Sequence, residues 1–169
     1  IIFYRDDCKK SVGYKRNQLI KSARGKYVCF VDDDDNVHEE YIKMIYEKLQ
    51  TNPDCVKLVS HMTYGKKGIV KRIHSIEYKE YINTPKVLYR PPTHINPIKK
   101  SIATKFKFPE YNFSEDKWWA MEICKSGLLK TEAKIDTPYY FYNFDENKSE
   151  TWKQRFNALR QHVRKYRKS

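Results

Sequence analysis

Four consecutive carboxylates, Asp32 to Asp35, stand directly behind an apolar run over residues 27–31. Adjacent anions repel one another, so holding them at the edge of an apolar core requires a compensating cation. Asp32 and Asp34 offer the oxygen ligands that Mg²⁺ or Mn²⁺ takes when phosphate and water supply the rest. The pattern therefore predicts a site for a divalent metal and a phosphate group, with Asp33 and Asp35 supporting the loop or contacting the substrate. The simpler alternative is that the acids stabilise the N-terminus of a following helix.

A second acidic pair, Glu115 and Asp116, lies about eighty residues downstream at the start of a Trp-rich helix. A partly desolvated carboxylate near aromatic rings is suited to accept a proton from a hydroxyl nucleophile. Trp118 and Trp119 would then form a wall on which an apolar sugar face stacks. Compensation of the helix dipole and burial of the Trp side chains in the core are the alternatives.

Three further polar residues are candidates for contacts with phosphate or with the acidic loop. Lys15 and Arg16 lie on the helix that precedes the four aspartates, and His94 is a candidate contact for a metal or phosphate. A solvated helix face explains Lys15 equally well, and a lone histidine is more often structural.

A phosphohydrolase of the haloacid-dehalogenase type is a rival interpretation of the same aspartates. Its motif, D-x-D-x-[TV] after an apolar strand, is matched by Asp33, Asp35 and Val37, and would make Asp33 the phosphorylated residue. That class also needs a later acidic metal pair near a Gly-Asp dipeptide, which this sequence lacks. A calcium EF-hand is excluded because the position that requires Gly is Val37 and the position that requires Glu is Lys43.

Alternating strand and helix patterns are expected to position these residues. A strand over 1–4, a helix over 14–23 and a buried strand over 27–31 have the size of a parallel βαβ unit. Asn36 and Glu39 have capping-box spacing before a helix that ends near Asn52 and Pro53. Beyond it we expect a strand over 56–60, a hairpin over 63–70, loop over most of 77–90, a short basic helix over 98–105, a helix from Ser114 to Gly127 and a strand over 133–144.

The composition is typical of a globular protein, and the positive net charge favours anionic partners. Its 169 residues carry a net charge of +13, which suits phosphates, nucleic acid or an acidic membrane surface. Four scattered cysteines favour neither a zinc site nor a disulfide framework, and no apolar run is long enough to span a membrane. We therefore expect a soluble, cytoplasmic protein. A basic amphipathic helix over 149–169, packed on the same domain, could contact an anionic membrane.

Taken in order, three segments resemble the core of family 2 glycosyltransferases. Residues 11–17 carry a helix with Arg-Asn, residues 23–28 an A-x-G-x-Y strand entry, and residues 30–35 a D-x-D-D metal site. Residues 94–98 and 113–119 are similar to the acceptor segment and the E-D base motif of compact bacterial and viral members. The resemblance covers roughly residues 1–145. It implies an α/β GT-A fold, a Rossmann-like mixed sheet flanked by helices, with 1–148 as the catalytic domain.

The resemblance also implies an activity and roles for individual residues. The enzyme would invert configuration while moving a sugar from a nucleotide-sugar donor, expected to be a UDP-sugar, to a glycan or other hydroxyl acceptor. Asp34 would ligate Mn²⁺ or Mg²⁺, Asp32 would lie near the ribose or the metal waters, and Asp116 would deprotonate the acceptor. The strand, helix and strand with which the family usually opens are missing from this sequence. A non-catalytic nucleic-acid module remains an alternative, although no recognised reader motif supports nucleic-acid binding.

Overall fold

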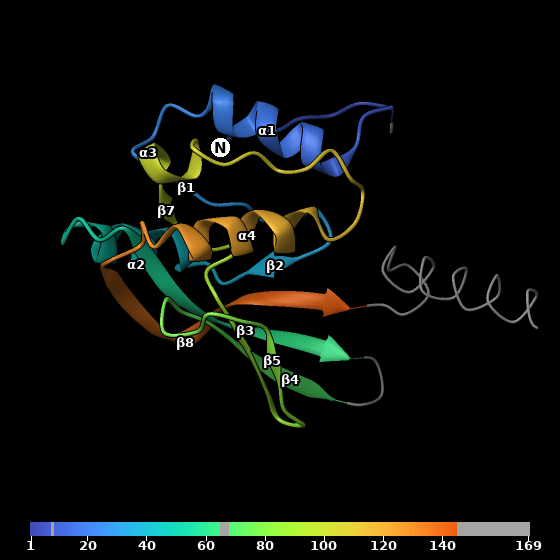
Figure 1. Cartoon of the computed structure of the whole chain (residues 1–169). Helices are drawn as coiled ribbons and strands as arrows, with labels where there is room; N and C mark the ends of the chain where they lie inside the picture. The colour runs from blue at the N-terminus through green and yellow to red at the C-terminus, as the bar shows by residue number, and fades with distance from the viewer. Residues whose placement is uncertain (8, 65–67, 145–169) are drawn as a thin grey trace, which may run out of the picture.

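The computed structural model describes residues 1–7, 9–64 and 68–144, and in this part of the chain eight strands form one mixed sheet flanked by helices (Figure 1). The strands are β1 (Tyr27–Val28), β2 (Asn36–Val37), β3 (Cys55–Tyr64), β4 (Ile69–His74), β5 (Ile82–Asn83), β6 (Val87–Arg90), β7 (Ile98–Lys99) and β8 (Glu132–Phe144). The helices are α1 (Val12–Ser22), α2 (Tyr41–Leu49), α3 (Lys100–Ala103) and α4 (Glu115–Ser126). The predicted α/β class with a mixed sheet is confirmed.

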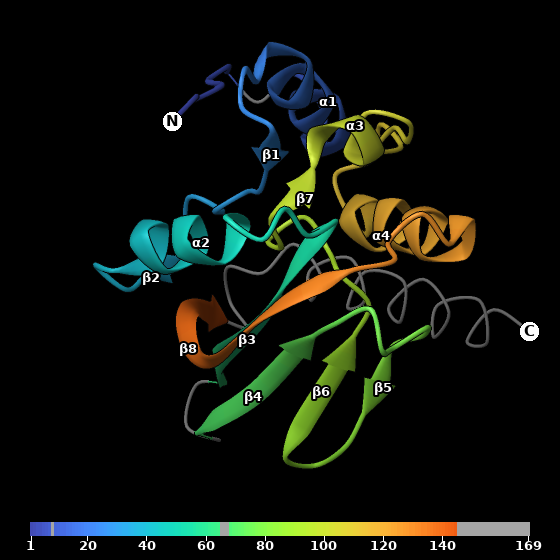
Figure 2. The same ribbon diagram turned by 90° about the vertical axis from the view of Figure 1, so that its left-hand side faces the viewer.

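Strand β3 organises the sheet, whose order is β1-β7-β3-β4-β6-β5. It pairs antiparallel with β4 and parallel with β8, which also pairs with β2. In Figure 2, β4, β6 and β5 fan out at one end of the molecule, while α1 and α3 gather around β1 and β7 at the other. The pairing of β8 with β3 and β2 brings the last described strand back to the acidic loop near the start of the chain.

Two apolar clusters anchor the helices to the strands. Buried residues of α1, α3, α4 and β7 meet in one cluster, which includes Ile20, Ile98 and Trp119. Buried residues of α2, β3 and β8 meet in the other, which includes Tyr41 and Tyr140. Cys55 belongs to the first cluster and its neighbour Val56 to the second. Because successive side chains of a strand point to opposite faces, the start of β3 is buried on both sides.

Three expectations for the first forty residues are wrong. Residues 1–4 form no strand, and the side chains of Ile1 and Phe3 are largely exposed, so they gain no burial from pairing. The strand expected over 27–31 is limited to the half-buried β1, which runs antiparallel to β7, so no parallel βαβ unit forms here. Asn36 pairs with β8 instead of capping a helix, and α2 begins after Glu40, which makes no side-chain cap.

The later elements follow the sequence pattern more closely. The hairpin is confirmed by the β3–β4 pairing, and the helix over 115–126 ends at Gly127, whose φ of 63° suits the left-handed conformation that glycine tolerates. Ser114 precedes this helix with a φ of 60° and provides no side-chain cap. The segment expected to be mostly loop contains β5 and β6, and the short basic helix is the single turn α3.

The last points concern contact with a membrane. The basic helix over 149–169 and its proposed membrane contact lie outside the described residues. None of the helices in the described ranges combines the length and apolarity that crossing a lipid bilayer requires.

Candidate active site

The acidic loop is a tight turn held in place by two distant segments. The backbone N–H of Asp35 donates to the carbonyl of Asp32 at 3.1 Å, which closes the turn. The N–H of Phe30 donates to the carbonyl of His94 at 2.9 Å, and the N–H of Asp32 donates to the hydroxyl of Tyr140 at 3.3 Å. The acidic loop is therefore held between the segment that carries His94 and strand β8.

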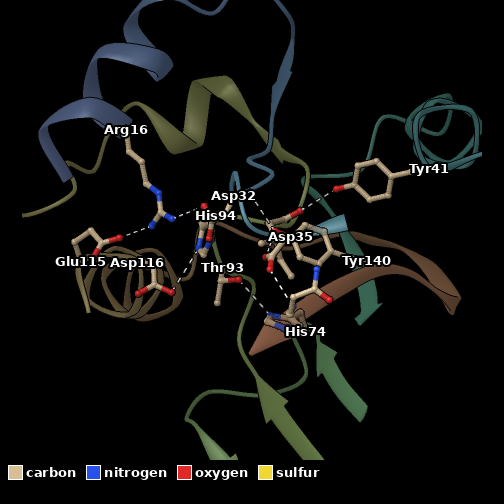
Figure 3. Close-up of polar contacts among 12 residues, drawn as sticks. Arg16, Asp32, Asp35, Tyr41, His74, Thr93, His94, Glu115, Asp116 and Tyr140 are labelled. Atoms are coloured by element: carbon tan, nitrogen blue, oxygen red, sulfur yellow. Dashed lines mark hydrogen bonds and ion pairs between the residues drawn. The ribbon is translucent and has the colours of Figure 1, made fainter. Parts of the chain in front are cut away.

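Arg16 reaches this loop from α1. The helix lies close to the segment before α4, because a Cβ on Gly13 would come within 1.9 Å of the Pro109 carbonyl oxygen. The Arg16 guanidinium lies 5.7 Å from the ring centres of both Phe30 and Phe108. Two aromatic faces thus hold a buried cation, and its N–H groups point toward carboxylates (Figure 3).

Arg16 joins the two acidic motifs that the sequence singles out. Its Nη2 donates to Asp32 Oδ1 at 2.7 Å, and its Nη1 donates to Glu115 Oε1 at the start of α4. Burial alone would lower the pKa of Arg16, but the surrounding carboxylates outweigh this effect and raise it. Glu115, also buried, has a raised pKa because desolvation exceeds the opposing effect of Arg16.

His94 makes a second connection between the same motifs. Its Nε2 lies 3.2 Å from Asp32 Oδ2, and its Nδ1 lies 3.5 Å from Asp116 Oδ2, an ion-pair distance without hydrogen-bond geometry. Burial would raise the pKa of Asp32, but His94 and Arg16 together hold it well below its usual range. Asp32 is therefore an anion that contacts both Arg16 and His94, as Figure 3 shows.

Asp35 contacts β8 instead. Its carboxylate accepts hydrogen bonds from the Tyr140 hydroxyl at 2.6 Å and from the Asn143 N–H at 3.2 Å. The Asn143 amide also donates to the carbonyl of Asp34 at 3.1 Å. Burial raises the pKa of Asp35 to about 6 despite these hydrogen bonds. Asp35 thus fixes the loop on the sheet.

The structure separates the two tryptophans and places Lys15 away from the acidic loop. Trp119 is 1% exposed and stacks on Phe108 at a centroid distance of 4.5 Å, so the predicted role of its ring in a sugar-stacking wall is wrong. Trp118 is 56% exposed. Lys15 pairs with Asp6 at 3.3 Å and makes no contact with the acidic loop within the described residues.

Several residues of this network carried no signal in the sequence. Tyr140 and Asn143 lie more than one hundred residues from the loop they hold, and each is an ordinary residue of an aromatic strand. Thr93 and His74, whose Oγ1 and Nδ1 lie 3.2 Å apart, continue the polar network beyond His94. No local spacing rule connects any of them to the aspartates.

The fit of the loop to a divalent cation depends on its free oxygen atoms. No group of three His, Cys, Asp or Glu side chains in the described ranges is arranged to hold a metal. Both carboxylate oxygens of Asp32 already face Arg16 or His94, whereas Asp33 and Asp34 are exposed. Burial and the neighbouring Asp32 and Asp33 raise the pKa of Asp34, which indicates excess negative charge there. Asp34 therefore fits a cation whose other ligands come from phosphate and water.

Comparison with known proteins gives one family and one fold. The model of the family described as glycosyl transferase family 2 matches residues 1–133. A crystal structure of residues 1–349 of S. aureus TarS matches with a TM-score of 0.57 at 20% identity, covering 79% of this chain and 40% of that one. The same TarS fragment in complex with UDP-GlcNAc matches with a TM-score of 0.59 at 20% identity, covering 81% of this chain and 40% of that one. The chain thus spans about 40% of the length of these structures.

Proposed function

Because the chain belongs to glycosyl transferase family 2, we propose that it transfers a sugar from a nucleotide-sugar donor to a hydroxyl acceptor at the cluster around Asp32 and Asp116. The observation that carries this proposal is the double connection between the acidic loop and the start of α4, through Arg16 and through His94. A transferase needs a donor diphosphate and a base within reach of one anomeric carbon, and this connection fixes the distance between the two motifs.

Asp116 is the better base of the two acids on α4. Its side chain is 32% exposed, so an acceptor hydroxyl can approach it, whereas that of Glu115 is 6% exposed and paired with Arg16. In the proposed reaction the acceptor oxygen forms a bond to the anomeric carbon while the bond from that carbon to the diphosphate oxygen breaks. The acceptor proton passes to the Asp116 carboxylate, and the nucleoside diphosphate leaves with the bonding electron pair. A single displacement of this kind inverts the anomeric configuration.

The donor is proposed to be a UDP-sugar held at the acidic loop. The UDP-GlcNAc complex of the similar TarS fragment supports this choice of nucleotide. Asp34 would hold Mn²⁺ or Mg²⁺, with Asp32 beside the ribose or the metal waters and the exposed Asp33 facing the substrate. Such an ion offsets the charge that develops on the leaving diphosphate. The family match favours glycosyl transfer over the phosphohydrolase and nucleic-acid alternatives.

The test is turnover by the full chain and by one variant with a matched control. With a panel of nucleotide-sugars and Mn²⁺, release of nucleoside diphosphate should fall by at least about 10²-fold in Asp116→Asn, because a positioned base contributes roughly that much or more. Donor affinity should stay within about threefold, since Asp116 acts on the acceptor. Glu122→Gln, an exposed acid on the same helix, should turn over like the wild type. Undiminished turnover in Asp116→Asn would assign the base elsewhere.

A further inference from the structure

Two arginines on neighbouring strands carry positive charge that no carboxylate among the described residues balances. In the described part of the chain, neither Arg72 on β4 nor Arg90 on β6 has an acidic side chain within ion-pair distance. Arg90 is buried, and its hydrogen bonds to described residues all go to neutral groups, two backbone carbonyls and the Asn83 side chain. Burial and the nearby Arg72 charge lower the pKa of Arg90 to about 10. The two cations are therefore close together, and no acidic side chain in the ranges that the structure describes neutralises them.

Arg72 has donors to offer to a ligand. Its guanidinium lies 5.2 Å from the ring centre of Tyr142, and its Nε is buried without a hydrogen-bond partner in the described ranges. Burying a hydrogen-bond donor without an acceptor is unfavourable. Carboxylates and phosphates bind a guanidinium bidentately in its own plane, so a guanidinium held over an aromatic ring can still recognise such a group.

The residues paired with the two arginines in the sheet carry polar atoms whose hydrogen bonds are also unsatisfied among the described residues. Ser60 lies opposite Arg72 in the β3–β4 register, and His74 lies beside Arg90 in the β4–β6 register. Both are fully buried, and neither the Oγ of Ser60 nor the Nε2 of His74 has a hydrogen-bond partner among the described residues. The Tyr81 hydroxyl also has no partner in this part of the chain. Since paired residues of adjacent strands share a face, Ser60, Arg72, His74 and Arg90 form one polar region of the sheet.

This region adjoins the proposed base. The guanidinium carbon of Arg90 lies 4.7 Å from the ring centre of Tyr81, and Lys117 Nζ lies 5.2 Å from the same ring centre. Lys117 follows Asp116 directly in the chain. On the other side, Ser60 is in register with Tyr140, which binds the acidic loop. Three cations thus lie next to the place where an acceptor hydroxyl must approach Asp116.

We propose that Arg72, Arg90 and Lys117 bind an oxyanion, a phosphate or carboxylate group, carried by the acceptor. The proposal rests on the proposed function, and it names the acceptor class as an anionic hydroxyl compound. The bound oxyanion neutralises the charge of the arginine pair. It also positions the neighbouring hydroxyl of the acceptor beside Asp116.

Binding to the full chain, measured by calorimetry, tests the proposal with three probes that differ in charge: glucose 6-phosphate, glucuronate and glucose. The two anions should bind at least tenfold more tightly than glucose. Arg72→Gln should weaken anion binding at least tenfold, and Lys117→Gln, exposed and therefore tolerant of substitution, at least threefold. Lys71→Gln removes the same charge from β4 on its opposite face and should leave binding within twofold. Thermal melting identifies any variant that fails to fold.

A separate arm distinguishes an acceptor oxyanion from the diphosphate of the donor. The affinity for UDP with Mn²⁺ should be unchanged in Arg72→Gln; a tenfold loss would overturn the proposal, because the arginines would then hold the donor. Equal binding of glucose and glucose 6-phosphate, or equal losses in the Arg72 and Lys71 variants, would also overturn it. Failure of the proposed function is a different result, namely no nucleotide binding or turnover while the anion preference and its dependence on Arg72 persist.

Discussion

Replacing Arg16 by glutamine removes a buried cation from between two carboxylates, and we expect a loss of stability of about 3 kcal/mol at neutral pH. Breaking a buried ion pair by deleting one partner typically costs about 3–5 kcal/mol, because the remaining charge is left uncompensated. The side chains of Arg16 and Glu115 are 9% and 6% exposed. Asp32 retains its contact with His94, so the penalty falls mainly on Glu115. The lower end of the range is therefore the appropriate estimate.

The pH dependence of this loss identifies its cause. The pKa of Glu115 is already raised by burial, and Arg16 opposes that rise. Without Arg16 it rises further, so the native variant binds more protons than its unfolded chain above the unfolded value of 4.5. The stability of the variant then falls as pH increases through this window. Its deficit relative to the wild type should be smaller at pH 5 than at pH 8.

Urea unfolding at the two pH values measures the effect, together with thermal melting. For a chain of this size, about 3 kcal/mol corresponds to a decrease in Tm of roughly 6–12 °C. Lys15→Gln, on the adjacent position of α1 and paired with Asp6 near the surface, should change stability by less than about 1 kcal/mol. An equal deficit for Arg16→Gln at pH 5 and pH 8 would refute the electrostatic argument and assign the loss to packing against the two Phe rings.

Three further outcomes follow from the fold and the loop. Trp119→Ala should cost about 3–5 kcal/mol of unfolding free energy in urea and Trp118→Ala less than about 1 kcal/mol, since only the first ring is buried; similar losses would contradict the assignment of Trp119 to the core. Gly13→Ala should destabilise the chain by about 1–3 kcal/mol, because its Cβ would meet the backbone of the neighbouring segment, and an unchanged Tm would contradict that close approach. The raised pKa of Asp35, about 6, means that the native state binds extra protons between about pH 4 and 6, so stability should fall as pH rises through this window. Tyr140→Phe deletes a hydrogen bond that lowers this pKa and should raise it further; a carboxyl NMR titration midpoint for Asp35 below 5 in either protein would exclude this account.

Local patterns predicted the later helices and strands better than the beginning of the chain. Helix α4 has Gly127 directly after its last turn, and such end signals act within a few residues. The start of the chain has the composition of a strand, but Ile1 and Phe3 have no apolar surface to cover them. Strand formation depends on a partner and on burial, and the residues themselves specify neither.

In the candidate site, the sequence indicated which residue types do chemistry, whereas their spatial arrangement depended on the fold. Asp32, Asp116 and His94 were recognisable because carboxylates and imidazoles perform acid–base and metal chemistry. That Arg16 connects the two acidic motifs could not be read from residues 99 positions apart. Trp118 and Trp119 are adjacent and chemically identical, and only the packing of α4 decides which ring is buried.

The parallel pairing of β3 with β8 has a consequence for how the site forms over time. Asp35 depends on Tyr140 and Asn143, which lie 105 and 108 positions later. During synthesis the acidic loop and the arginine that joins it to α4 emerge long before the strand that holds the loop in place. Closing so large a loop is entropically costly, and folds dominated by distant pairings reach the native state slowly, in milliseconds to seconds. Binding competence should therefore appear as a late step in refolding, after most helical structure has formed.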